Sequence, residues 1–125
     1  MNITAHKTHK IQPNENLFEI LDRYLPPLEE KSVVAIASKI VGICEGRVIK
    51  NESQEQKDEL IKQEADYYLP REYSQYGFML TIKNNLLVGG AGIDESNANG
   101  YFSLWPKDPQ QSANAIREYL TKKYY

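Results

Sequence analysis

A glycine-rich segment in the second half of the chain carries the side chains best suited to chemistry. Residues 89–100 hold four of the seven glycines and the cluster Asp94-Glu95-Ser96-Asn97. Glycines lack a Cβ and let backbone amides approach a ligand closely, while Asp94, Ser96 and Asn97 offer the hard oxygen atoms that magnesium and manganese prefer. Such a loop could hold a metal ion that bridges the phosphates of a nucleotide. Composition alone favours a second interpretation, a long connection between strands in which Asp and Asn form turns.

A second candidate is the pair Ser38-Lys39, which directly follows the apolar run of residues 32–37. That run is rich in β-branched residues, the pattern of a buried strand. Ligand-binding groups tend to lie at the carboxyl ends of strands, and a lysine there can neutralise a phosphate. An exposed lysine at a strand end is also common, so the pair alone has two interpretations.

The histidines and the single cysteine give weaker signals. His6 and His9 lie in a polar segment, residues 2–11, which we predict to be a first strand. Residues three apart face opposite sides of a strand, so the two histidines are not expected to share a metal ion. Cys44 lies in an apolar stretch and has no second cysteine to pair with, so we interpret it as a small core residue.

The elements that must position these residues are helices and short strands. The first helix is expected to be capped by Asn14 or Asn16 and to stop at Pro26-Pro27. Strands are expected at 78–82, 86–88 and 102–105. A second helix should run from the Ser53–Gln56 capping box to Leu69-Pro70, with an exposed Asp58–Lys62 pair. A third helix should be capped by Asp108 and bury Ala113, Ile116 and Leu120. Residues 40–48 fit either helix or strand.

Length and composition predict one globular domain over residues 1–125. The chain is 41% apolar and 26% charged, with a formal charge of −2, so it gives no electrostatic reason to expect a nucleic acid partner. No apolar run approaches the roughly 18 residues of a membrane helix, and no signal peptide is recognisable, so we expect a cytoplasmic protein without membrane contact. The order of elements predicts a mixed α/β (α+β) fold, with a mixed sheet and flanking helices.

Three motifs, in order along the chain, resemble one known family. They are Ala37-Ser38-Lys39 continuing to Glu45-Gly46-Arg47, then Ala91-Gly92-Ile93-Asp94-Glu95-Ser96-Asn97, then Trp105-Pro106-Lys107-Asp108-Pro109 followed by Ser112-Ala113 and Ile116-Arg117. Together they resemble the F-420-0:gamma-glutamyl ligases, whose second motif reads Ala-Gly-Ile/Val-Asp-x-Ser-Asn. The resemblance covers most of the chain and implies the amino-terminal part of that family's fold.

The resemblance implies a ligase that depends on GTP and on a divalent metal, magnesium or manganese. Such an enzyme activates a carboxylate of the coenzyme precursor as an acyl phosphate, which the amine of glutamate then attacks. Asp94 matches a metal-binding aspartate, Asn97 a nucleotide contact, and Ser38 and Lys39 a nucleotide-contacting pair. The resemblance assigns no general acid or base in this chain. It also implies a homodimer, which the nine tyrosines favour independently, because tyrosine is enriched at interfaces.

The sequence departs from the family pattern at several positions. Residues 5–9 stand where the family has Gly-Leu/Ile-Pro, Ile43 stands where a second lysine is expected, and Gly90 replaces an asparagine. Family members are longer and carry further metal ligands in the additional part, so we expect this chain to be catalytically incomplete by itself. The alternative is a non-catalytic module that keeps the fold and binds a nucleotide or a protein partner, or a purely structural domain.

Overall fold

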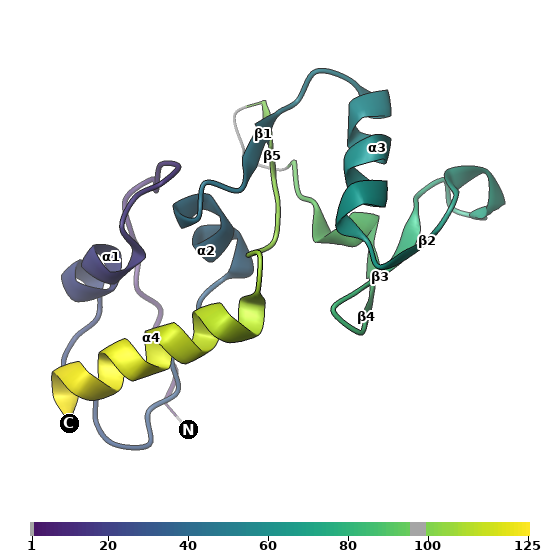
Figure 1. Ribbon diagram of the computed structural model, residues 1–125. Helices are drawn as coiled ribbons and strands as arrows, with labels where there is room; N and C mark the ends of the chain where they lie inside the picture. Colours follow the sequence, from purple (N-terminus) through teal and green to yellow (C-terminus); the bar gives the residue numbers. More distant parts are fainter. Residues whose placement is uncertain (1, 96–99) are drawn as a thin grey trace. The chain divides into compact units, whose positions relative to one another are not determined.

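A computed structural model describes residues 2–95 and 100–125 of the chain (Figure 1). In order, the elements of this part are α1 (Leu17–Tyr24), α2 (Ser38–Cys44), β1 (Val48–Lys50), α3 (Gln54–Glu64), β2 (Tyr67–Leu69), η1 (Arg71–Tyr73), β3 (Leu80–Lys83), β4 (Leu86–Gly89), η2 (Gly90–Gly92), β5 (Tyr101–Ser103) and α4 (Pro109–Tyr124). The predicted mixed α/β class is confirmed. The strands of the described part form two small sheets instead of one, β1-β5 and the antiparallel β2-β3-β4.

The chain divides into two compact units. Unit 1 comprises residues 1–48 and 105–125, and unit 2 comprises residues 49–104. Unit 1 has a core of Leu21, Val41, Ile116 and Leu120, whereas the core of unit 2 is built from Leu60, Phe102 and Leu104 and, next to them, Ile61, Met79 and Ala91. Within the residues the structure describes, no helix is both long and apolar enough to cross a membrane.

The helices of unit 1 begin at the predicted caps. The side chain of Asn16 accepts the Phe18 N–H (3.0 Å), and α1 ends before Pro26-Pro27, as predicted. Asp108 accepts the Gln111 N–H (2.9 Å) at the start of α4, which also confirms the prediction. Ile116 and Leu120 are buried on α4, but the Ala113 side chain is exposed, contrary to the predicted stripe.

Two predicted strands of unit 1 are wrong. Residues 2–11 and 32–37 belong to no strand in the structure. The second segment alternates, since Val33 is exposed while Val34 and Ile36 pack on the core of unit 1. Alternating apolar residues let an extended segment bury one side against a core. A strand also needs a neighbouring strand that hydrogen-bonds to its backbone. The ambiguous residues 40–48 divide into most of α2, a turn and the start of β1.

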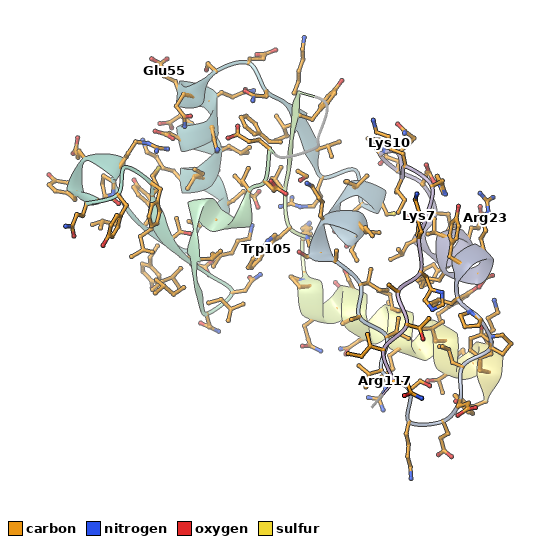
Figure 2. All side chains as sticks on the ribbon, turned by 180° about the vertical axis from the view of Figure 1, so that it is seen from behind. Lys7, Lys10, Arg23, Glu55, Trp105 and Arg117 are labelled. Atoms are coloured by element: carbon orange, nitrogen blue, oxygen red, sulfur yellow. The ribbon has the colours of Figure 1, made fainter. Side chains whose placement is uncertain are left out.

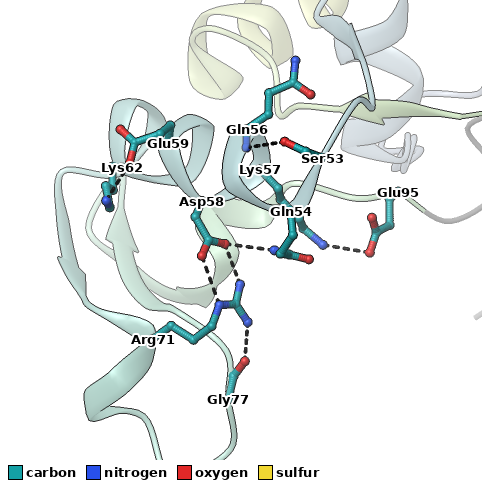
Figure 3. Close-up of polar contacts among 10 residues, drawn as sticks. All are labelled: Ser53, Gln54, Gln56, Lys57, Asp58, Glu59, Lys62, Arg71, Gly77 and Glu95. Atoms are coloured by element: carbon teal, nitrogen blue, oxygen red, sulfur yellow. Dashed lines mark hydrogen bonds and ion pairs between the residues drawn. The ribbon is translucent and has the colours of Figure 1, made fainter.

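The helix of unit 2 is α3, whose start is fixed by the predicted capping box (Figure 3). Ser53 Oγ accepts the Gln56 N–H (3.1 Å), and the Gln56 side chain reaches back to the Glu52 N–H (2.9 Å). The helix was expected to run to Leu69-Pro70, but it ends at Glu64, because residues 67–69 pair with β3 as strand β2. A cross-strand partner thus overrides the local helical pattern.

Asp58 does not form the predicted pair with Lys62. Its carboxylate binds the guanidinium of Arg71 (2.7 and 3.2 Å), and Arg71 also donates to the carbonyl of Gly77 (Figure 3). The hydrogen bonds from Arg71 hold the pKa of Asp58 below its usual value. Lys62 binds Glu59 instead. The charged face of α3 therefore anchors the loop between β2 and β3 in addition to facing solvent.

The hairpin of β3 and β4 turns at Asn84-Asn85, whose φ angles of 51° and 62° are those of a tight hairpin turn. Its pairing places Thr81, 1% exposed, on the inner face of the sheet. The Thr81 hydroxyl donates to the Val88 carbonyl (2.5 Å) and accepts the Ala91 N–H (2.9 Å). Ala91 is completely buried and has a φ of 51°, so its amide has no access to water. Thr81 therefore satisfies a buried backbone donor.

In unit 1, the turn Glu45-Gly46-Arg47 holds the segment before α4. The Glu45 carboxylate accepts the Lys107 N–H (2.9 Å) and the Ser112 hydroxyl (2.7 Å). Arg47 Nε donates to the carbonyl of Trp105 (2.7 Å), the residue labelled in Figure 2. The first and third sequence motifs therefore meet through hydrogen bonds.

We predict that Thr81→Val lowers the free energy of unfolding by about 1–3 kcal/mol, because valine keeps the shape and leaves the buried Ala91 amide unpaired. Urea denaturation measures the change. Thr81→Ser is the matched control, since it keeps the hydroxyl and removes only a methyl group. A valine variant as stable as the serine variant would show that the hydrogen bond contributes nothing.

We predict that Gly46→Ala destabilises unit 1 by about 1–3 kcal/mol more than Gly77→Ala does. Both glycines have positive φ, 71° and 67°, so both substitutions strain the backbone. A Cβ at Gly46 would lie 2.3 Å from Asn14 Oδ1, whereas one at Gly77 meets nothing within 4 Å. Thermal denaturation compares the two variants, and adding Asn14→Gly should restore most of the difference. Equal losses would mean that Asn14 moves aside freely.

Candidate functional site

Asp94 lies at the end of a segment whose backbone is fixed on both sides. Before it, the turn η2 is held by the buried amide of Ala91 and by the hydrogen bond from the Gly90 N–H to the Met79 carbonyl (2.8 Å). The Asp94 N–H donates to the Ser103 carbonyl (3.0 Å), and the Asp94 carbonyl accepts both the N–H (2.8 Å) and the hydroxyl (3.1 Å) of Ser103. Asp94 is partly buried and therefore has a defined position in unit 2.

The residue after Asp94 is anchored to α3. Lys57 Nζ lies 2.8 Å from Glu95 Oε1 (Figure 3). The same ammonium group lies 5.8 Å from the centre of the buried Phe102 ring. Most of the Lys57 side chain is shielded from water, which strengthens its attraction to the carboxylate. Ser96 and Asn97, the other candidates of this loop, lie outside the described residues, so the role predicted for Asn97 stays a prediction.

Ser38 and Lys39 form the first turn of α2 in unit 1, although we expected them at the end of a strand. Ser38 is exposed and Lys39 partly buried. Ser38 lies at the border of a cavity of about 940 Å³ within unit 1, which is lined mostly by apolar side chains including Val34, Ile36 and Ile116. Asp94 belongs to unit 2, and the roles of both candidate groups stay predictions.

A divalent metal ion fits the described residues only in part. No group of three or more His, Cys, Asp or Glu side chains that could hold a metal occurs in residues 2–95 and 100–125. Asp94 supplies a hard carboxylate oxygen, which suits magnesium or manganese, but these ions take about six ligands. Further oxygens would come from a nucleotide, from water or from residues beyond the described part.

His9 takes part in a hydrogen-bond network that the sequence did not predict. Its ring nitrogens lie 2.8 Å from the Tyr24 hydroxyl and 2.7 Å from a Glu15 carboxylate oxygen. The N–H of Gln12 and the His9 ring lower the pKa of Glu15. Both His9 nitrogens thus have protein partners. No local sequence signal links His9 to Tyr24, fifteen residues away.

Cys44 fits its interpretation as a structural residue. It lies at the end of α2 and is partly buried. Burial raises the pKa of its thiol, and the carboxylates of Glu15 and Glu45 act in the same direction. A thiol in this environment stays protonated at neutral pH and is a poor nucleophile.

Comparisons with known proteins confirm the resemblance that the three motifs suggested. Residues 6–125 match the family model described as F420-0:Gamma-glutamyl ligase. A coenzyme F420:L-glutamate ligase of Methanopyrus kandleri is 31% identical over 89% of this chain and 50% of its own length. Enzymes of the same name from Methanococcus maripaludis strains C6 and S2 are 28% and 31% identical, over 94% and 98% of this chain and 53% and 55% of their lengths. The chain spans about half the length of these curated relatives, and it belongs to the F420-0:gamma-glutamyl ligase family.

Proposed function

We propose that this chain forms part of a cytoplasmic ligase that joins glutamate to a carboxylate of the F420 precursor or of a related acid. The proposed reaction consumes GTP and passes through an acyl phosphate. Family membership supports an F420 glutamate ligase-like function, and the names of the relatives point to the same reaction class. Because the chain spans about half the length of those relatives, the complete activity would require additional residues.

In this proposal the residues of the chain bind and position the nucleotide. Asp94 would supply one ligand to a divalent metal ion, which screens the negative charge that develops during phosphoryl transfer. Asn97 would contact the nucleotide beside it. Lys39 would place a positive charge against a phosphate, and Ser38 would offer its hydroxyl as a hydrogen-bond donor.

The observation that carries the proposal is the fixed backbone of Asp94. Three hydrogen bonds join its amide and carbonyl to Ser103, and the preceding turn is buried at Ala91. A metal ligand must be held within about half an ångström of its working position. The hydrogen bonds to Ser103 would keep the Asp94 backbone in one position relative to a bound metal ion.

We predict that Asp94→Ala weakens metal-dependent binding of GTP about a hundredfold or more, since even an outer-shell substitution at a metal site costs about 10–100-fold. Calorimetry with GTP and with ATP, each with and without manganese, measures the effect. The thermal midpoint should change little, because the three hydrogen bonds to the backbone and hydroxyl of Ser103 use the backbone of Asp94, which alanine keeps.

Glu55→Ala is the control variant for this experiment. Glu55 is an exposed carboxylate on α3, so its removal changes the net charge by the same amount without touching the proposed site. It should bind nucleotide like the unmodified chain. If the unmodified chain binds neither nucleotide in a metal-dependent way, the proposal fails for this part of the enzyme, and a module with an interaction role takes its place. A large loss of stability in Asp94→Ala would mark Asp94 as a structural residue.

A further inference from the structure

Lys57 of α3 contacts both chain segments that meet at Asp94 and Ser103. These two residues form an antiparallel bridge, in which the backbone N–H of each donates to the carbonyl of the other (3.0 and 2.8 Å). One position further along, the same register brings Glu95 beside Phe102. Lys57 Nζ lies 2.8 Å from Glu95 Oε1 (Figure 3). The same nitrogen lies over the Phe102 ring, 5.8 Å from its centre, so one side chain joins the two residues.

The backbone makes no such link at this position. In an antiparallel ladder, a pair that exchanges hydrogen bonds is followed by a pair whose N–H and C=O groups point away from each other. Asp94 and Ser103 exchange their hydrogen bonds, so Glu95 and Phe102 depend on side chains to stay together. Phe102 is 1% exposed and gives the ammonium group of Lys57 a fixed partner. Lys57 therefore extends the bridge by one position.

The anchoring of Glu95 also determines the side to which Asp94 points. Side chains of an extended segment alternate between its two sides. Ile93 has an extended backbone (φ −70°, ψ 126°) and packs against the core of unit 2, and Glu95 is held on the same side by Lys57. Asp94 lies between these two residues, so its side chain is directed to the opposite side. A shift of Glu95 would therefore turn the Asp94 carboxylate.

The Lys57–Glu95 pair differs from an ordinary surface ion pair. Lys62 and Glu59 on the same helix form such a pair, with side chains that are 38% and 64% exposed, and pairs of this kind contribute little to stability. The Lys57 side chain is 18% exposed and also contacts an aromatic ring, which strengthens its attraction to both partners. Glu95 stands at position x of Ala-Gly-Ile/Val-Asp-x-Ser-Asn, so the family motif does not account for the pair.

We propose that Lys57 is a positioning residue, which holds the Asp94 carboxylate in place for metal-dependent nucleotide binding. This role rests on the proposed function, because that function supplies the ligand of Asp94. Lys57 acts through Glu95 and the bridge to Ser103, and it has no contact of its own with the metal ion or the nucleotide. The site then depends on one ion pair that lies outside it.

Replacement of Lys57 by methionine tests the proposal, since methionine keeps an apolar stem over Phe102 and removes the charge. The Asp94 N–H donates to the Ser103 carbonyl, and we expect it to exchange with solvent about fivefold faster in Lys57→Met. Metal-dependent binding of GTP should weaken about tenfold, the lower end of the range for groups that support a metal ligand. Hydrogen exchange followed by NMR measures the first effect, and calorimetry with GTP and manganese measures the second.

Three further variants separate positioning from other effects of charge. Lys57→Arg keeps a cation against both partners and should restore both values. Lys62→Met is the matched control, because it removes the same charge from the same helix and should change neither value. Glu95→Met removes a negative charge, which by itself would favour an anionic nucleotide, but the lost ion pair should weaken binding about tenfold. The double variant of Lys57 and Glu95 should bind no more weakly than either single variant.

Unchanged exchange of the Asp94 amide in Lys57→Met would overturn the proposal, as would nucleotide binding by that variant that is as tight as in the unmodified chain. Tighter binding by Glu95→Met would also overturn it, because the charge would then act directly on the nucleotide. If the unmodified chain binds no nucleotide while the Asp94 amide still exchanges faster in Lys57→Met, the proposed function fails and Lys57 is a structural residue only. Failure of the site and failure of the positioning role therefore give different results.

Discussion

The structure of unit 2 depends on how the buried amide of Ala91 is satisfied. Ala91 is an alanine with positive φ inside the core, and its N–H has no access to water. An unpaired buried donor costs about 1–3 kcal/mol, so some side chain must accept from it. Thr81 does so with its hydroxyl. Because successive side chains of a strand alternate, this one hydrogen bond requires Thr81 to point inward and both its neighbours to point outward.

Two features of unit 2 follow from this orientation. Lys83 lies two residues after Thr81 on β3, so its side chain also points inward. There the carboxylate of Glu64 compensates for the loss of hydration of the ammonium group. The side chain of Ile82 points outward for the same reason, and it lies between Tyr67 and Leu87 on the solvent-facing side of the sheet. A one-residue shift of register would bury these apolar side chains, but it would also leave the Ala91 amide unpaired. The exposed apolar face is therefore a consequence of the hydrogen bond that supports the segment leading to Asp94.

The sequence predicts the parts of the fold whose causes are local. The caps at Asn16, Ser53 and Asp108 act within three residues, and each was found where its pattern indicated. The Asn84-Asn85 turn is equally local. The errors have distant causes: residues 32–37 have the alternation of a strand without a neighbouring strand, and α3 stops early because β3 provides a partner for residues 67–69.

The candidate site shows the same division between local and distant causes. Asp94 is predicted from a motif of adjacent residues. Lys57, which binds the next residue of the loop, lies 38 positions before Glu95 and belongs to no recognisable pattern. Asp58 similarly finds Arg71, thirteen residues away, and not the nearer Lys62. Side chains that bind across the fold can be assigned only when the fold is known.

Some motif residues match the family because they stabilise the fold, and their contacts identify them. Glu45 and Ser112 are 67 residues apart and bind each other, and Arg47 binds the backbone of Trp105. These side chains already have a structural function, so their agreement with the family pattern is explained by the fold. They give no support to a nucleotide site. The proposed site therefore involves the Asp94 segment and the Ser38-Lys39 turn, and not the residues of this hydrogen-bonded contact.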